Sequence, residues 1–256
     1  MDSWQLLNSE LDAWAADGKV ADFWWRDDDA ASSGAKLDEL LSVTETTGLL
    51  LAVIPAKADQ SLAASLQAAP HVIVAQHGYA HINHAPRGQG LGAWELGLHR
   101  GERAVLEELD HGRQLLEALF ADTFIPVIVP PWNHIDSALM APVADKGFCG
   151  VSCFGPRQDR QLSPGFTVVN SHCDPIRWKE GADFKGDSKT VNQLVDHLKA
   201  RRTGLVDTTE PSGFLTHHLV MEEDSWNFCR QLVDNINSHP AAHWCKDVSV
   251  LFGSDS

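Results

Sequence analysis

The sequence predicts a single α/β domain in which parallel strands alternate with helices, either a (β/α) barrel or an open sheet. Short apolar runs typical of strands alternate with stretches whose apolar residues recur every three or four positions. The chain has 256 residues, a length that suits one barrel, and 43% of them are hydrophobic, enough for a packed core. No linker, repeat or low-complexity run divides the chain, so one domain is expected.

The first predicted element is an amphipathic helix, because apolar residues from Trp4 to Trp14 follow a spacing of three and four. It belongs to an N-terminal segment, residues 1–19, that we expect to pack on the domain. The domain itself is expected to span residues 20–250. Residues 251–256 end in Gly, Ser and Asp and are expected to form a frayed tail.

The predicted strands are short continuous apolar runs, the pattern of strands that are buried on both faces. They are expected at residues 20–25, 49–54, 72–75, 125–129, 150–154, 166–170 and 213–216. Helices are expected at residues 37–43, 62–66 and 105–119, after Asp136, and at residues 191–200 and 225–236. This alternation predicts crossover connections and parallel strand pairs.

The charge balance is strongly acidic, with 20 Lys and Arg against 35 Asp and Glu, a net charge of −15. Such a charge argues against nucleic acid or an anionic membrane as the main partner. The sequence has no run of 18 apolar residues and no basic-then-apolar signal segment. Its five cysteines form an odd set without a CxxC pair, which favours reduced thiols and a cytoplasmic location. Nothing in the sequence fixes the oligomeric state.

Polar clusters follow several of the predicted strands. They are Asp27-Asp28-Asp29, His77 with His81, Trp132-Asn133-His134, and His217-His218. The carboxyl ends of parallel strands meet at one rim, so these clusters are expected to converge. An acidic triple alone is most often a turn or a helix cap, and an HxxxH pair often lies on a wet helix face. Together they offer an Asp/His/His set that suits zinc with one open position.

In chain order these motifs resemble the five motifs of the polysaccharide deacetylase family, carbohydrate esterase family four. They read Arg26-Asp27-Asp28-Asp29, His77-Gly78-Tyr79-Ala80-His81, Val129-Pro130-Pro131-Trp132, Asp174-Pro175-Ile176-Arg177-Trp178 and Leu215-Thr216-His217. The resemblance covers about residues 20 to 220, and its HGYAH and LTHH segments are the most specific. The chain also resembles a divergent subgroup of short deacetylase-like proteins without a signal sequence.

The resemblance implies a distorted (β/α) barrel that hydrolyses an N-acetyl or O-acetyl group of a sugar-like or small substrate. It implies Zn²⁺ or another divalent transition metal, held by Asp29, His77 and His81, with Asp28 as the general base. The family pattern has two acids where this chain has three. A register shifted by one residue makes Asp27 the base and Asp28 the ligand instead.

The other roles implied by the resemblance concern the oxyanion and the leaving group. The backbone N–H of Trp132 is expected to hold the tetrahedral oxyanion. His217 is expected to protonate the departing amine, with Asp174 keeping its imidazole cationic. Substrate contacts are expected from Tyr79, Asn133 and Trp178.

Three departures from the family pattern leave other interpretations open. Val129 stands where the family has the arginine that orients the base, and Arg26 is a candidate substitute. Arg177 replaces the second aspartate of the fourth motif, and Asn133 stands where the family usually has glycine. One alternative is a catalytically inactive carbohydrate-binding or regulatory barrel. Another is a non-haem iron oxygenase with the same Asp/His/His set, although that chemistry usually sits on a double-stranded β fold.

Some polar residues are expected to have no chemical role. His84 is interpreted as a loop residue and His197 as a surface or helix-end histidine. The segment around Glu210 is interpreted as a plain turn. His218 is expected to point away from His217 and to pack behind the sheet.

Overall fold

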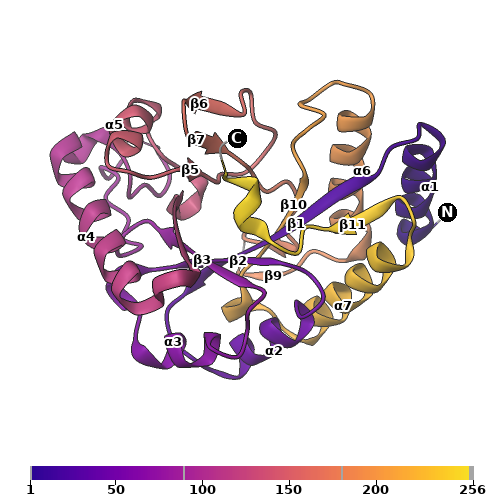
Figure 1. Ribbon diagram of the computed structural model, residues 1–256, viewed down its shortest axis with the longest axis horizontal. Coiled ribbons are helices and arrows are strands. Elements are labelled where there is room, and N and C mark those ends of the chain that lie inside the picture. The colour runs from indigo at the N-terminus through magenta and orange to yellow at the C-terminus, as the bar shows by residue number, and fades with distance from the viewer. Residues whose placement is uncertain (1, 89, 180, 254–256) are drawn as a thin grey trace.

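A curled sheet of mainly parallel strands forms the centre of the molecule, and helices cover its outer face (Figure 1). The computed structural model describes residues 2–88, 90–179 and 181–253. The last three residues of the predicted tail therefore lie outside the described residues.

Eleven strands occur in the described part of the chain. They are β1 (Ala21–Ala30), β2 (Leu49–Val53), β3 (Val72–His77), β4 (Phe124–Val129), β5 (Gly150–Val151), β6 (Gln161–Ser163), β7 (Phe166–Val168), β8 (Ile176–Arg177), β9 (Asp183–Phe184), β10 (Ser212–Thr216) and β11 (Ala242–Trp244). The α-helices are α1 (Ser3–Ala16), α2 (Ala35–Val43), α3 (Gln60–Leu66), α4 (Glu102–Phe120), α5 (Met140–Asp145), α6 (Asp187–Arg202) and α7 (Glu223–Ser238).

The strand order is β10-β1-β2-β3-β4-β5-β7-β6, with every pair parallel except β6 with β7. β11 adds a further parallel pair with β1. The chain beyond β7 pairs with β10 through the bridge Cys173–Phe214, so the two ends of the curl approach each other. This curled, mainly parallel sheet in one α/β domain confirms the predicted fold class, a distorted (β/α) barrel.

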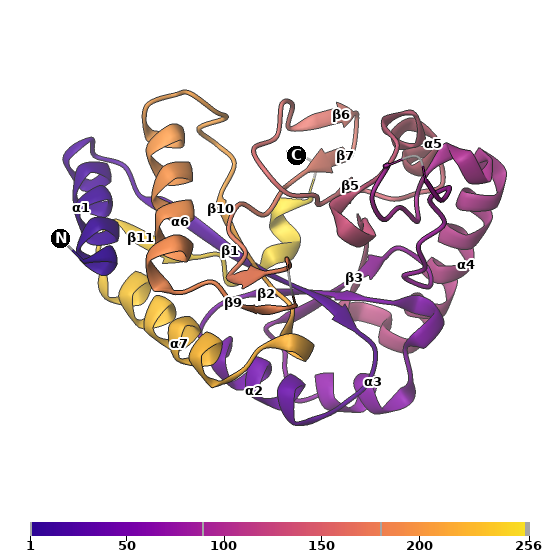
Figure 2. The ribbon, with the colours of Figure 1, turned by 180° about the vertical axis from the view of Figure 1, so that it is seen from behind.

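Side-chain alternation along β1 separates the outer core from the inside of the curl. Phe23 and Trp25 pack in the outer core among residues of the helices. Trp24 instead packs with buried residues of the neighbouring strands and with Phe252. Phe252 follows the 3₁₀ helix Val248–Leu251, which lies within the curve of the sheet in both views (Figures 1 and 2). An apolar layer therefore fills the barrel on the amino-terminal side of the next inward residue, Arg26.

The N-terminal helix α1 lies against α6 in both views (Figures 1 and 2). It begins with a capping box, in which the Asp2 carboxylate accepts from the Gln5 N–H at 2.8 Å. Arg202 of α6 donates to Glu10 of α1 at 2.7 Å, and Leu11 is fully buried in the outer core. These contacts fix α1 on the barrel.

The structure differs from the sequence expectation at the end of β1, which continues through the acids to Ala30 instead of ending at residue 25, and at short strands. β5 and β7 end at Val151 and Val168, earlier than the predicted strands. The regular pairing of these two strands stops there because the Cys153 N–H donates to the side-chain oxygen of Asn170 at 2.8 Å and not to a backbone oxygen of the neighbouring strand. The strands β6, β8, β9 and β11 have two or three residues each and lack the apolar runs that predict strands. Within the described residues, no helix combines the length and apolar character needed to cross a membrane.

Candidate active site

A cavity of about 440 Å³ opens at the carboxyl ends of the central strands. Its lining residues are Asp28, Asp29, His77, His81, Trp132, Asn133, Phe154, Asp174, Trp178 and His217. The convergence expected from the strand-end clusters is therefore present. Phe154 is the lining residue that the sequence analysis did not name. Its place at the end of the strand predicted at residues 150–154, and hence at the same rim, is a signal that could have identified it.

A bulge in β1 turns two consecutive acids toward this cavity. In a regular strand Asp28 and Asp29 would point to opposite faces. Here the register between β1 and β2 shifts between Asp27 and Ala30, and Asp29 has a φ of 75°. Bulges of this kind re-aim side chains beside functional sites. Both carboxylates therefore reach the cavity from one strand.

Asp29, His77 and His81 bring three potential metal ligands together. Asp29 Oδ1 lies 3.2 Å from His77 Nε2 and 3.2 Å from His81 Nε2. This oxygen is buried and has no hydrogen-bond partner in the described part of the chain. Donor atoms that bind one tetrahedral ion at about 2.0–2.2 Å lie roughly 3.4 Å apart. The three side chains therefore fit a divalent transition metal.

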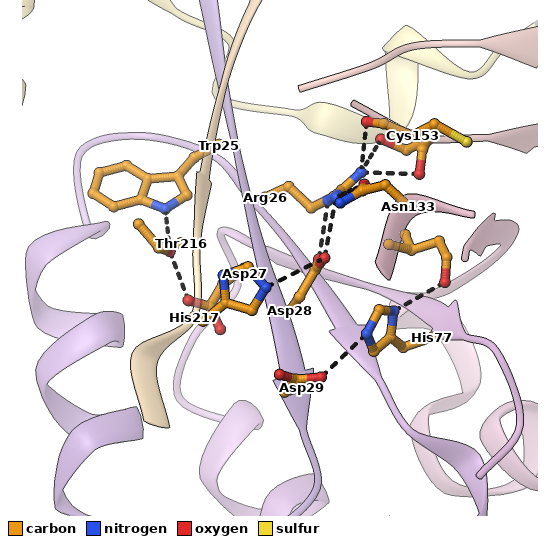
Figure 3. Close-up of polar contacts among 12 residues, drawn as sticks. Trp25, Arg26, Asp27, Asp28, Asp29, His77, Asn133, Cys153, Thr216 and His217 are labelled. Atoms are coloured by element: carbon orange, nitrogen blue, oxygen red, sulfur yellow. Dashed lines mark hydrogen bonds and ion pairs between the residues drawn. The ribbon is translucent and has the colours of Figure 1, made fainter. Parts of the chain in front are cut away.

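A hydrogen bond at His77 Nδ1 orients this ring so that Nε2 can bind a metal. His77 Nδ1 lies 2.9 Å from the backbone oxygen of Val129, an atom that only accepts (Figure 3). The ring proton of neutral His77 is therefore on Nδ1, which leaves the lone pair of Nε2 free to face Asp29. Such a bond from the distal nitrogen is the usual device that orients a metal-ligating histidine.

The electrostatics favour the cation-binding forms of Asp29 and His81. His77 has the opposite tendency, because burial lowers its pKa but the carboxylates of Asp28 and Asp29 outweigh burial and raise it. Burial raises the pKa of Asp29, but the imidazoles of His77, His217 and His81 outweigh it and hold that pKa well below its usual value. Burial lowers the pKa of His81, and the neighbouring His77 lowers it further. Asp29 is therefore ionised and His81 neutral near pH 7.

Arg26 and Asp28 form a buried ion pair beside the metal-ligand group (Figure 3). Arg26 Nε lies 2.9 Å from Asp28 Oδ1, and Arg26 Nη2 donates to Asp28 Oδ2 at 3.0 Å. Nη2 also donates to Asn133 Oδ1 at 2.6 Å, and Nη1 donates to the backbone oxygens of Ser152 and Cys153. The structure therefore separates the acids: Asp28 faces the arginine, whereas Asp29 faces the two histidines.

His217 lies on the other side of Asp28, close to the rim of the cavity. Its Nε2 is 4.0 Å from Asp28 Oδ2, and its ring makes a T-shaped contact with the Trp178 indole, with 4.6 Å between ring centroids. Asp174 does not bond to His217; its carboxylate accepts from Trp178 Nε1 at 2.8 Å and from the Ile176 N–H at 2.8 Å. Nδ1 of His217 is buried without a hydrogen-bond partner in the described part of the chain.

Among the described non-glycine residues, left-handed backbone is concentrated at this site. Among the described residues, non-glycine residues with positive φ include four of the cavity lining: Asp29, His81, Trp132 and Asn133. For a residue as bulky as Trp132, with a φ of 56°, this conformation costs energy and persists only when the surroundings enforce it. The turn after β4 is held by a bond from the Asn133 N–H to the Pro130 oxygen at 2.8 Å. Strain of this kind is typical of functional sites.

Asp27 and Tyr79 lie outside the cavity lining. The Asp27 carboxylate is fully buried and contacts His218 Nδ1 at 2.5 Å and the Thr216 hydroxyl at 2.6 Å. His218 therefore pairs with Asp27, away from the face that carries His217. Tyr79, expected as a substrate contact, lies with its ring 5.8 Å from that of His111 on α4. The backbone turn at Gly78 carries it away from His77.

A second group of potential ligands, His172, His197 and Glu210, is buried behind β10. The Gly213 N–H donates to His172 Nδ1 at 3.0 Å, so the ring proton of neutral His172 is on Nε2. That nitrogen faces Glu210 Oε2 at 3.3 Å and has no lone pair for a metal. The group is therefore better described as a structural network. The expectations of a surface His197 and a plain turn at Glu210 were wrong, because long-range packing that leaves no local pattern buries both.

The low pKa of His197 in this network predicts that the folded protein loses stability in acid. His197 stacks on His172 with 3.4 Å between ring centroids, and burial, His172 and Arg201 together lower the pKa of His197 to about 2. The unfolded chain takes up this proton below about pH 6.5, whereas the folded chain does not. Protons therefore favour the unfolded state, and the free energy of unfolding should fall by up to about 1.4 kcal/mol per pH unit below pH 6 from this residue.

Urea unfolding at pH 7.5, 6 and 5 measures this dependence. His197→Leu removes the titrating group and should flatten the pH dependence, even if it changes stability at pH 7.5. An unchanged pH slope in that variant would contradict the assignment.

Solved structures with a similar fold exist, whereas searches with the sequence itself found no match. No protein-family model and no curated protein matches this sequence. A structure described as a polysaccharide deacetylase from Mycobacterium smegmatis superposes with a TM-score of 0.68 at 14% identity, over 92% of this chain and 90% of that one. The catalytic domain of a peptidoglycan N-acetylglucosamine deacetylase from Eubacterium rectale gives 0.54 at 14% identity, over 88% of each chain.

A pseudoenzyme of carbohydrate esterase family 4 from Bacillus anthracis is also similar, with a TM-score of 0.55 at 11% identity. That match covers 91% of this chain and 66% of the pseudoenzyme. At such identities the likeness concerns the fold, which active and inactive proteins share. This chain has the fold of the polysaccharide deacetylases of carbohydrate esterase family 4, the family that its motifs resemble.

Proposed function

We propose that the protein is a metal-dependent hydrolase that removes an acetyl group from a sugar-like or small N-acetylated or O-acetylated compound. One observation carries the proposal: a single cavity joins a metal-ligand group, a separate carboxylate and a further histidine. These are the parts that hydrolysis of an amide or ester needs.

Asp29, His77 and His81 would hold the divalent cation, with Zn²⁺ as the first candidate. When bound, such a cation polarises an acyl oxygen and lowers the pKa of water to about 7. Asp28 is the proposed base because its carboxylate lies outside the ligand group and its orientation is fixed by Arg26. It takes one proton from the water whose oxygen bonds to the acetyl carbon.

The remaining residues act on the oxyanion and on the leaving group. The N–H of Trp132, in the strained turn after β4, is the proposed donor to the oxyanion. When the bond between the acetyl carbon and nitrogen breaks, His217 gives a proton to the departing nitrogen, so that acetate and an amine leave. The exposed rings of Trp132, Trp178 and Phe154, on the cavity walls, suit packing against a sugar ring.

The second candidate function is an inactive carbohydrate-binding or regulatory barrel. The observation that favours it is the pairing of Asp174 with Trp178, which leaves His217 Nδ1 without the acidic partner expected for a catalytic acid. An iron oxygenase has less support, because the α/β barrel is not the double-stranded β fold on which that chemistry usually occurs.

Metal analysis of the purified protein tests the proposal. We expect close to one equivalent of zinc or another transition metal, and release of acetate from N-acetylglucosamine oligosaccharides or 4-nitrophenyl acetate. His81→Ala should lose both the metal and the activity. His84→Ala is the matched control, because this exposed imidazole lies three residues further along the same loop and outside the ligand group.

Absence of metal after zinc is offered would overturn the hydrolase proposal. Metal binding without acetate release, combined with saturable binding of the oligosaccharides, would favour the binding barrel instead.

A further inference from the structure

His77 ends β3 and His81 follows it in a turn that is not helical, so the common direction of the two rings needs an explanation. β3 ends at His77, and the chain then turns through Gly78, with a φ of 55°, to His81, with a φ of 54°. In a helix, residues four apart share a face without further help. Here the backbone between the histidines must be held by other groups.

The Glu95 carboxylate lies inside this turn. Glu95 Oε1 accepts from the Ala80 N–H at 2.9 Å and from the Ile82 N–H at 3.4 Å. Glu95 Oε2 accepts from the Tyr79 N–H at 3.3 Å. The Glu95 side chain is fully buried and has no contact with water. The hydrogen bonds from these amides therefore replace the hydration that the carboxylate loses on burial. The N–H groups of the two residues next to His81, Ala80 and Ile82, are thus bonded to one carboxylate oxygen.

Gly78 shows how closely Glu95 approaches the turn. A Cβ atom at Gly78 would lie 2.1 Å from Glu95 Oε2 and 2.6 Å from Pro131 Cγ. Only glycine leaves room for the carboxylate, and its positive φ suits the same residue. The carbonyl side of the turn is held separately, because Gln76 Nε2 donates to the Gly78 oxygen at 2.9 Å.

Glu95 is itself fixed by the chain around it. Its backbone oxygen accepts from Arg100 Nη1 at 3.3 Å. The next residue, Leu96, is buried, forms a bridge with Ile135 and accepts the Asp136 N–H at 3.0 Å. The carboxylate is therefore a preformed support for the turn.

We propose that Glu95 is a positioning residue: its carboxylate holds the turn from Gly78 to Ile82 in the conformation that brings His81 beside His77 and Asp29. The consequence for metal affinity rests on the proposed function. Loss of the carboxylate frees the amides on both sides of His81, so the ring no longer has a fixed place relative to the other two ligands.

Hydrogen exchange of the metal-free protein tests the positioning directly. In the wild type, the amides of Tyr79, Ala80 and Ile82 should be protected. Glu95→Gln keeps the shape of the side chain but places an NH2 group, which only donates, where one acceptor oxygen stood. Exchange should therefore accelerate at least about tenfold at the amides that lose this oxygen, while the helices stay protected. The control is Glu107→Gln, because Glu107 on α4 is exposed and, in the described part of the chain, pairs with the exposed Arg103 at 3.7 Å. Unchanged protection in Glu95→Gln would overturn the proposal.

Zinc affinity, measured by competition with a chromophoric chelator, tests the consequence. We expect Glu95→Gln to raise the Kd for Zn²⁺ by about 10- to 100-fold, the usual effect of removing support from a ligand, and Glu107→Gln to leave it unchanged. A residue that only stabilised the fold would lower Tm without changing this Kd, so an unchanged Kd in folded Glu95→Gln would also overturn the proposal.

The two proposals fail in different ways. If the wild type binds no zinc, the hydrolase proposal fails, and the exchange rates alone decide the role of Glu95. If Glu95→Gln does not fold, Glu95→Asp keeps the charge but shortens the side chain. Faster exchange in the turn of that variant would support the proposal, and unchanged exchange would overturn it.

Discussion

Replacing Asp28 with asparagine is expected to lower kcat about a thousandfold, within the range that general bases contribute, and to leave the metal content unchanged. Asparagine matches the shape of aspartate but cannot take a proton from water. The metal should stay because Asp29, not Asp28, lies 3.2 Å from both histidine nitrogens. Steady-state kinetics together with metal analysis of Asp28→Asn measure both effects.

Asp29→Asn and His217→Ala are the comparison variants for this prediction. Asp29→Asn should lose metal, whereas His217→Ala should keep it and slow substrates with poor leaving groups more than 4-nitrophenyl acetate. The alternative register of the acids would be correct if Asp28→Asn lost the metal and Asp29→Asn retained it.

Replacing Arg26 with methionine is expected to lower the free energy of unfolding by about 3–5 kcal/mol, the usual cost of removing one partner of a buried ion pair. The Arg26 side chain is 0% exposed and that of Asp28 is 2% exposed, so water cannot replace the lost contacts. The variant also leaves the backbone oxygens of Ser152 and Cys153 without the guanidinium donor. Denaturation by guanidinium chloride, followed by circular dichroism, measures the change.

A double-mutant cycle separates the ion pair from the other losses. Because Asp28→Asn removes the charge that Arg26→Met leaves unpaired, the double variant should be more stable than the sum of the two single effects by at least about 1 kcal/mol. Additive effects would show that Arg26 stabilises the fold without a coupling to Asp28. Arg26→Lys keeps a positive charge and serves as the milder variant if Arg26→Met does not fold.

The convergence of the site was predictable from the sequence because it follows from topology. In parallel strands the residues at and after each carboxyl end meet at one rim. Asp29, His77 and His217 lie at or next to the carboxyl ends of β1, β3 and β10. The fold class followed from the same alternation of strands and helices. Neither inference needed the position of any loop.

What the sequence did not predict depends on contacts between distant segments. Glu95 lies in a loop without periodicity, and only its burial under Gly78 shows what its carboxylate holds. The stacking of His197 on His172 likewise has no local pattern, so a buried histidine was interpreted as a surface one. The order of the motifs predicted that Asp174 would contact His217. In the structure the Asp174 carboxylate instead accepts a hydrogen bond from Trp178 Nε1.

The place of Val129 shows how β4 serves the site without a polar side chain. Because Arg26 and Asp28 lie two residues apart on β1, the base and its cation depend on one strand and not on the alignment of two. β4 contributes main-chain atoms instead: the Val129 oxygen accepts from His77 Nδ1 and from the Gly78 N–H. Its isopropyl group remains in the apolar layer with Trp24 and Phe252. The apolar layer thus includes the last residue of β4. Position 129 can therefore vary among aliphatic residues while its backbone oxygen keeps the same two hydrogen bonds.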